Sequence, residues 1–210
     1  MLRYERDPAE IYRQSFETVR AEAELEHLPA DLQTVAIRLV HACGMPEITA
    51  RLAWSDDLAI SARSALSSGA PILCDCEAVA SMIVRNRLPA KNPVICTLNA
   101  PETRQIATRI ENTRSAAAVT LWEDVIGGAV VAVGNAPTAL FHLLELIDQG
   151  FPHPAAILGF PVGFVGAAES KAELAARPRA PFLTLRGRRG GSAMAAAAVN
   201  ALAAGLETPQ

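Results

Sequence analysis

Two apolar runs that each break into a glycine-rich loop place the strongest constraint on the fold of this chain. The run Ala129–Val133 is followed by Gly134, and the run Pro154–Leu158 is followed by Gly159. About five apolar residues, then glycine, then a residue able to cap a helix, are typical of a buried parallel strand that ends at a ligand-binding loop. The sequence therefore predicts that function lies at the carboxyl edge of a parallel sheet.

Predicted strands and helices alternate along the rest of the chain. Strands are predicted at 71–74, 93–98, around 130, around 155 and at 182–185, and helices at 7–25, 29–43, 55–69, 77–88 and near the C-terminus. This order indicates an α/β fold with a largely parallel five-stranded sheet and helices on both faces, a Rossmann-like three-layer α/β/α arrangement with an N-terminal helical segment. Half of the 210 residues are hydrophobic, so residues 1–210 are expected to form a single domain, with a mainly helical part at 1–69 and the alternating core at 70–206.

Charge and hydropathy exclude several classes of partner. A formal net charge of -3 gives no general attraction to nucleic acid or to an anionic membrane. The first residues lack the apolar core of a secretory signal, and no apolar run reaches the roughly eighteen residues of a membrane span, so a cytoplasmic protein is expected. Four cysteines lie in apolar segments, where reduced, buried thiols are the expected state, and the C-x-C spacing of Cys74 and Cys76 does not predict a metal site.

His41 is the best candidate acid or base, because no nucleophile elbow or paired-carboxylate motif is present. It lies in the last turn of the predicted helix 29–43, where unpaired carbonyl groups favour a protonated imidazole, so its pKa is expected to be raised. From the residues alone, a surface histidine that caps its own helix is equally well supported. In the first helix, Ser15 shares the predicted inward face with Ile11 and Val19, where it is either a tolerated core hydroxyl or a ligand contact.

Three segments are suited to binding an anion. Asn112–Ser115 begins a new helix with fresh N–H groups and an arginine, Gly134–Thr138 offers capping oxygens and backbone donors, and Arg186–Gly191 places cations at a helix start. Arg85–Arg87 is either a solvated basic helix end or a further anion contact. Neither G-x-G-x-x-G nor G-x-x-x-x-G-K-[ST] occurs, so the expected ligand carries carboxylates and is not a nucleotide.

Several sequence blocks, in order, resemble one known family. They are His41–Gly44, Pro71–Asp75, Asn112–Ala118, Val133–Phe141, Pro154–Lys171 and Arg186–Met194. These blocks resemble those of the precorrin-8X methylmutases, the precorrin isomerases of cobalamin biosynthesis, and they extend almost from end to end. The chain departs from the family pattern at Met45–Glu47 and at Cys76.

The resemblance implies an activity and a set of site residues. It implies an isomerase that converts precorrin-8X to hydrogenobyrinic acid by an intramolecular 1,5-sigmatropic shift of a methyl group from carbon 11 to carbon 12 of the tetrapyrrole. It implies no cofactor and no metal, a homodimer with its site near the interface, and His41 as the catalytic acid. The substrate-binding residues that it implies are Ser15, Arg114, Ser115, Asn135, Thr138, Ser170, Lys171, Arg186 and Arg188.

Three other hypotheses remain open from the sequence. A homologous mutase of the anaerobic branch would act on the cobalt-containing substrate, cobalt-precorrin-8. A non-catalytic tetrapyrrole carrier would hold the product and pass it to the next pathway enzyme, and it would need no acid at His41. A nucleotide-binding oxidoreductase is disfavoured because its glycine fingerprint is absent.

Overall fold

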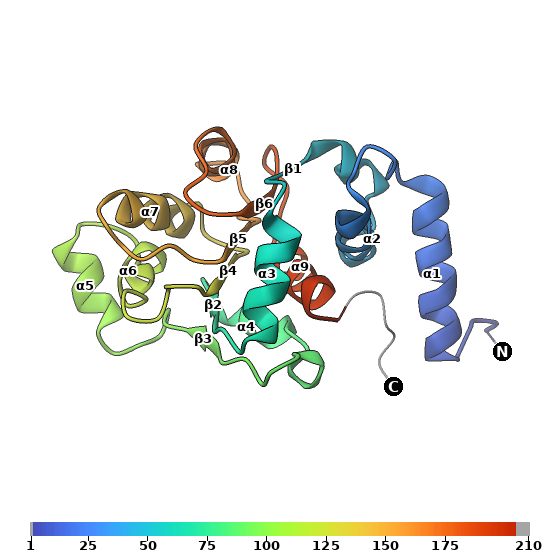
Figure 1. Cartoon of the computed structure of the whole chain (residues 1–210), viewed down its shortest axis with the longest axis horizontal. Helices are drawn as coiled ribbons and strands as arrows, with labels where there is room; N and C mark the ends of the chain where they lie inside the picture. The colour runs from blue at the N-terminus through green and yellow to red at the C-terminus, as the bar shows by residue number, and fades with distance from the viewer. Residues whose placement is uncertain (1, 205–210) are drawn as a thin grey trace.

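The computed structural model describes residues 2–204, which are arranged around one mixed sheet (Figure 1). The helices are α1 (Pro8–Glu22), α2 (Ala30–Cys43), α3 (Leu58–Ser67), α4 (Glu77–Met82), α5 (Thr103–Arg109), α6 (Arg114–Thr120), α7 (Pro137–Asp148), α8 (Ala167–Ala176) and α9 (Ser192–Ala204), with 3-10 helices η1 (Pro46–Arg51) and η2 (Arg85–Arg87). The strands are β1 (Leu52–Trp54), β2 (Ile72–Cys74), β3 (Val94–Cys96), β4 (Val130–Val133), β5 (Ala156–Gly159) and β6 (Phe182–Leu185).

The sheet has the strand order β1-β6-β5-β4-β2-β3. The five strands from β6 to β3 are parallel, as predicted, and Val131 of β4 pairs with Leu73 on one side and with Ile157 on the other. Strands β4, β5 and β6 are buried along their whole length because helices cover both faces of the sheet. The carboxyl ends of these strands meet at one edge, as the glycine-rich loops predict.

The sheet also contains a sixth strand that the sequence analysis did not predict. β1 pairs antiparallel with β6 at one edge of the sheet, and Ala53 lies opposite Thr184. Three residues between a 3-10 helix and α3 are too few to show a strand periodicity. The predicted number of five strands therefore describes only the parallel part of the sheet.

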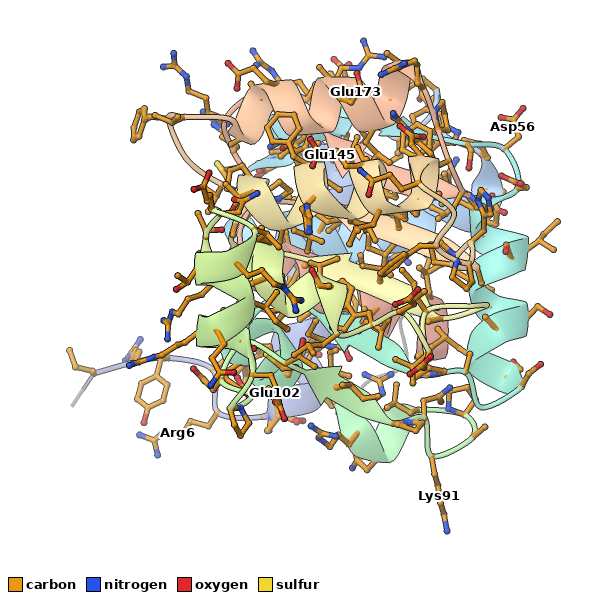
Figure 2. The ribbon with its side chains drawn as sticks, turned by 90° about the vertical axis from the view of Figure 1, so that its left-hand side faces the viewer. Arg6, Asp56, Lys91, Glu102, Glu145 and Glu173 are labelled. Atoms are coloured by element: carbon orange, nitrogen blue, oxygen red, sulfur yellow. The ribbon has the colours of Figure 1, made fainter. Side chains whose placement is uncertain are left out.

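The two faces of the sheet carry different layers of helices (Figure 1). On one face α3, α4 and α9 contact the strands, α2 packs against α9, and α1 packs against α2. On the other face lie α5, α6, α7 and α8, and Figure 2 looks onto this layer, in which Glu145 and Glu173 come from α7 and α8. The predicted three-layer arrangement is confirmed, and α1 and α2 extend it on one side.

The start of α1 and the end of α2 are fixed by capping residues. The Asp7 carboxylate accepts a hydrogen bond from the Ala9 N–H at the start of α1, and Pro8 is the first helical residue. Gly44 adopts a left-handed conformation with φ 67° at the end of α2. Gly44 thereby fixes the last turn of α2, which carries His41. No helix within residues 2–204 has both the length and the hydropathy to cross a membrane.

The predicted helix 77–88 is interrupted. α4 ends at Met82 because the Asn200 side chain of α9 takes two backbone groups that a continuous helix would use. The Val84 N–H donates to Asn200 Oδ1 over 2.9 Å, and Asn200 Nδ2 donates to the Met82 carbonyl over 3.1 Å. The chain turns away after Met82 and places Arg87 in the separate turn η2.

Candidate active site

His41 lies where α1 packs against the last turn of α2. Its Nδ1 is 2.7 Å from Ser15 Oγ, the Tyr12 ring stacks at a centroid distance of 5.4 Å, and the Phe16 ring approaches edge-on at 5.4 Å. Tyr12, Ser15 and Phe16 occupy i, i+3 and i+4 positions and therefore share one face of α1. Ser15 faces inward, as predicted, but Ile11 does not share this face and is 45% exposed.

The pKa of His41 is lowered from the ordinary value for histidine. Desolvation by burial is the largest cause, and the positive charge of Arg38, one turn earlier in α2, acts in the same direction. The end of a helix favours a protonated imidazole in its last turn, but the net shift at His41 is downward. The raised pKa expected from the sequence is therefore wrong, because burial and Arg38 both favour the neutral imidazole.

His41 opens onto a cavity of about 270 Å³ between α1, α2, α9 and the segment that follows α4. Ala193, Ala196 and Ala197 line it from one face of α9. The methyl groups of these alanines make that part of the wall apolar, and Asn200 lines the cavity further along the same helix. Arg38 and Arg87 line the same cavity, so an apolar surface, an imidazole and two cations meet at one place.

Asp75 holds the loop that follows β4. This buried carboxylate accepts hydrogen bonds from three consecutive backbone N–H groups, those of Gly134 at 2.8 Å, Asn135 at 2.9 Å and Ala136 at 2.8 Å. Burial raises the pKa of Asp75, whereas the three hydrogen bonds act in the opposite direction. The loop amides that the sequence suggested as donors to a ligand are thus bound within the protein, and the Asn135 side chain is exposed instead.

Thr113 and Thr138 join the starts of α6 and α7 on the other face of the sheet. The Thr113 hydroxyl is 2.8 Å from the Thr138 hydroxyl and also accepts the Ala116 N–H. Arg114, the first residue of α6, is exposed beside this contact, and Ser115 is half-buried. The structure thus brings Arg114, Ser115 and Thr138, which the sequence places in two separate segments, to the same edge of the sheet.

The first turn of α9 connects this loop region to the His41 cavity. A Cβ atom on Gly134 would lie 2.7 Å from the Cα of Ser192, so the loop after β4 packs directly against the start of α9. Ala193, the next residue of α9, lines the His41 cavity. The loop after β4 and the His41 cavity therefore both border the first turn of α9.

Ser170 and Lys171 have internal contacts in this structure. Both residues are fully buried; Ser170 Oγ donates to the Ala167 carbonyl, and Lys171 Nζ donates to the Arg189 carbonyl. Burial lowers the pKa of Lys171 to about 8. The Lys171 contact supports the basic loop after β6, whereas the Ser170 contact lies within α8, and neither side chain is exposed at the surface.

Arg186 and Arg188 are exposed in the loop between β6 and α9. The Arg186 N–H donates to the Arg51 carbonyl, and the Arg188 guanidinium lies 5.6 Å from the centre of the Phe164 ring. Gly190 packs against the Phe160 carbonyl so closely that no side chain would fit there. The glycines of this loop therefore permit close packing between the loops at the carboxyl edge.

The sequence did not lead us to Asp75 as the residue that holds the loop after β4. It also did not predict that Arg38 and Arg87 line the same cavity. Asp75 follows a buried strand directly, which is a position where a polar side chain reaches the loop edge of a parallel sheet. Arg38 precedes His41 by three residues, and that spacing alone places both on one side of α2. Between residues 2 and 204, no three His, Cys, Asp or Glu side chains form a group that could hold a metal ion, and all four cysteines are free.

Comparison with known proteins agrees with this arrangement along nearly the whole chain. Residues 10–204 match the family model for precorrin-8X methylmutase. The chain is 58% identical over 204 residues to the precorrin-8X methylmutase of Pseudomonas aeruginosa, which covers 97% of this chain and 98% of that protein. It is 36% identical over 198 residues to the cobalt-precorrin-8 methylmutase of Methanothermobacter thermautotrophicus, which covers 93% of this chain and 92% of that protein.

A solved structure supports the same assignment. The precorrin-8X methylmutase of Thermus thermophilus superposes with a TM-score of 0.84 and 36% identity, over 92% of this chain and 94% of that one. The fold, the order of the sequence blocks and the near-complete coverage agree with one another. This chain belongs to the precorrin-8X methylmutase family.

Proposed function

We propose that this isomerase converts precorrin-8X to hydrogenobyrinic acid by an intramolecular 1,5-sigmatropic methyl shift from carbon 11 to carbon 12, with His41 as general acid. The observation that carries the proposal is the contact of His41 Nδ1 with Ser15 Oγ at the wall of a cavity. Because Nδ1 is engaged by Ser15, Nε2 is the nitrogen that can face a ligand. An imidazolium donates from both nitrogens, so it can hold Ser15 and the macrocycle at once.

Ser15 selects which proton His41 gives up. When the imidazolium donates its Nε2 proton to the macrocycle, the remaining proton stays on Nδ1 and is held by the Ser15 hydroxyl. Positive charge on the conjugated ring system then lowers the barrier to methyl migration, and the proton returns to Nε2 when the product forms. No methyl donor enters this scheme, because the methyl group stays on the same molecule.

The pH dependence follows from the lowered pKa of His41. The acid form is lost as pH rises through this pKa, so kcat/KM, which reports on the free enzyme, should fall at a pH below the ordinary value of 6.5. In the complex, a carboxylate-rich substrate favours the imidazolium, so kcat should fall at a higher pH than kcat/KM. Steady-state rates across about pH 5 to 9 measure both. A profile of kcat/KM that stays level across this window contradicts the role of His41 as a charged acid.

Arg114 is proposed to bind a substrate carboxylate, together with Ser115, Asn135 and Thr138. Its position beside the Thr113 and Thr138 hydroxyls at the carboxyl edge supports this role. Arg114→Ala should weaken substrate binding by about 1.5 to 3 kcal/mol, because a charged hydrogen bond to a carboxylate is lost. Titration of the protein with hydrogenobyrinic acid measures the change, and Arg109→Ala, in the preceding helix, is the control. Equal affinity of the Arg114 variant and the control removes Arg114 from the site.

Arg186 and Arg188 are proposed as further contacts to the substrate from the loop before α9, because both are exposed and cationic. Lys171 is proposed to act through its support of that loop, since its ammonium group is buried against the Arg189 carbonyl, and Ser170, its buried neighbour in α8, is proposed to help position Lys171. A homodimer is also proposed. Cavities that enclose drug-sized ligands occupy roughly 300 to 1,000 Å³, and the His41 cavity of one chain has about 270 Å³. A second subunit would supply the missing walls.

The test of the proposed function is anaerobic incubation of the purified protein with precorrin-8X and no cofactor. The absorption change to hydrogenobyrinic acid is the expected result. Turnover of the cobalt-containing substrate alone would replace the proposal with the anaerobic-branch activity. Binding of hydrogenobyrinic acid without turnover of either substrate would instead support a carrier that transfers the product to the next enzyme.

A further inference from the structure

A groove runs between α7 and α8 on the outer face of the layer formed by α5 to α8. The volume of this α7–α8 groove is about 640 Å³. Each of the two helices lines it with residues at positions i, i+3, i+4 and i+7, which share one face of a helix. They are Phe141, Leu144, Glu145 and Asp148 of α7 and Glu169, Ala172, Glu173 and Ala176 of α8. A groove between two helices is suited to hold a segment of another chain.

The floor of the α7–α8 groove is apolar and its rim is acidic. Leu144 is buried and Phe141 is half-buried at the floor, beside two alanines of α8. Four carboxylates and two guanidinium groups line the groove, so its net charge is negative. Figure 2 looks onto this groove, with Glu145 and Glu173 on its two sides. An amphipathic, basic segment is therefore the complementary occupant.

The N-terminal arm, residues 2–6, has large apolar side chains in contact with solvent. Leu2 is 86% exposed and Tyr4 is 68% exposed. Their i, i+2 spacing places both side chains on the same side of an extended segment. Among residues 2–204, no hydrogen bond or ion pair connects the arm to a residue beyond Asp7. The fold of one chain thus leaves the apolar side of the arm uncovered.

The arm is also basic on its outer side. Arg3 and Arg6 are both exposed, and the Arg6 guanidinium lies 4.8 Å from the centre of the Tyr4 ring. The one acidic side chain of the arm, Glu5, turns back to the backbone and accepts the N–H groups of Arg6 at 2.6 Å and Asp7 at 2.9 Å. The arm therefore presents two apolar side chains and two cations, which match the apolar floor and the acidic rim of the groove.

The arm cannot reach the groove of its own chain. Five extended residues span at most about 18 Å, and the N-terminus and α7 lie on opposite sides of the molecule (Figure 1). The arm of a second copy has no such restriction. A two-fold axis between two copies would place each arm in the groove of the other, so that both grooves are filled at once.

We propose that the N-terminal arm of one copy docks in the α7–α8 groove of a second copy. Leu2 and Tyr4 lie on the apolar floor, and the arginines lie beside the carboxylates of the rim. This inference rests on the homodimer of the proposed function and names the segments that join its subunits. The arm and the groove contain none of the residues that line the His41 cavity, so the inference can fail while the proposed activity stands.

The apolar part of the contact is tested by Tyr4→Ser, with Ile60→Ser as the control. Ile60 is 74% exposed on α3, outside the arm and the groove, so the control also removes a large exposed apolar side chain. Sedimentation equilibrium should show a dimer dissociation constant at least about tenfold larger for Tyr4→Ser, because each dimer contains two arms. The dissociation constant of Ile60→Ser should stay within about threefold of that of the unsubstituted protein.

The charged part of the contact is tested by reversal and rescue. Arg3→Glu with Arg6→Glu in the arm, and Glu145→Lys with Glu169→Lys in the groove, should each raise the dissociation constant at least about tenfold, because like charges then meet. The chain that carries all four changes should return to within about threefold of the unsubstituted protein. A matched control for the groove is Glu102→Lys with Glu123→Lys, since both residues are exposed and neither lines the groove.

Each other outcome overturns the inference. Equal dissociation constants of Tyr4→Ser and Ile60→Ser show that the arm does not join the subunits. If only the groove variant weakens the dimer, another segment of the second copy fills the groove. An unsubstituted protein that stays monomeric at all concentrations overturns the homodimer together with the docking of the arm, and turnover of precorrin-8X by the same preparation shows whether the proposed activity stands.

Discussion

His41→Ala is expected to lower kcat by about a hundred- to ten-thousand-fold, which is the usual contribution of a positioned general acid. This range corresponds to roughly 3 to 5 kcal/mol of the activation barrier. The affinity for hydrogenobyrinic acid should change little, because arginines, and not the imidazole, are proposed to hold the ligand. The measurement is the anaerobic rate with precorrin-8X, together with a product titration of the same preparation.

The control for His41 is His153→Ala. His153 is an exposed histidine in the loop before β5, its Nδ1 lies 2.6 Å from the Arg179 carbonyl, and it is at the opposite edge of the sheet from the loops of the site. The His153→Ala protein should keep full activity. The activity of Ser15→Ala should lie between those of His41→Ala and His153→Ala, because His41 Nδ1 loses its partner while Nε2 remains. A His41→Ala protein that turns over normally but no longer binds the product would falsify the assignment of His41 as the acid.

Asp75→Ala is expected to lower the free energy of unfolding by about 3 to 5 kcal/mol, since several backbone donors lose a charged partner and each such loss costs about 1 to 3 kcal/mol. The affected N–H groups are those of Gly134, Asn135 and Ala136, which become unpaired in or beside the core. Substrate affinity should also fall, because the loop that carries Asn135 and leads into Thr138 loses its support. Urea unfolding measures the first effect, and product titration measures the second.

Asp75→Asn removes the negative charge at this position but keeps a side chain of almost the same size and shape. The amide keeps one acceptor oxygen but turns an N–H₂ group toward backbone donors, so the loss should be smaller than for Asp75→Ala, about 2 kcal/mol. Asp56→Ala is the matched control, because Asp56 projects into solvent (Figure 2), and its replacement should change stability by no more than about 0.5 kcal/mol. If Asp75→Ala unfolds at the same urea concentration as Asp56→Ala, the loop does not depend on this carboxylate.

The local elements of the fold could be predicted from the sequence because their signals are local. The apolar runs of β4 and β5 indicate strands that are buried on both faces, and Asp7, Pro8 and Gly44 set the ends of α1 and α2 through capping. The alternation of strands and helices then favours a parallel sheet with helices on both sides. β1 was missed because three residues carry no measurable period, and its pairing with β6 depends on a segment about 130 residues away.

The sequence by itself determined the class of fold, the edge of the sheet at which the glycine-rich loops meet and the position of His41 at a helix end. Only the tertiary structure decided what surrounds these groups. The sign of the His41 pKa shift depends on burial beside Tyr12 and Phe16 and on Arg38, and the donors of the loop after β4 are taken up by Asp75. Arg87 reaches the same cavity because Asn200 of α9 interrupts α4. Capping and hydrophobic periodicity act between residues a few positions apart, so they can be predicted from the sequence. Desolvation and tertiary hydrogen bonding act between any groups that the folded chain brings together, so they cannot be predicted in this way.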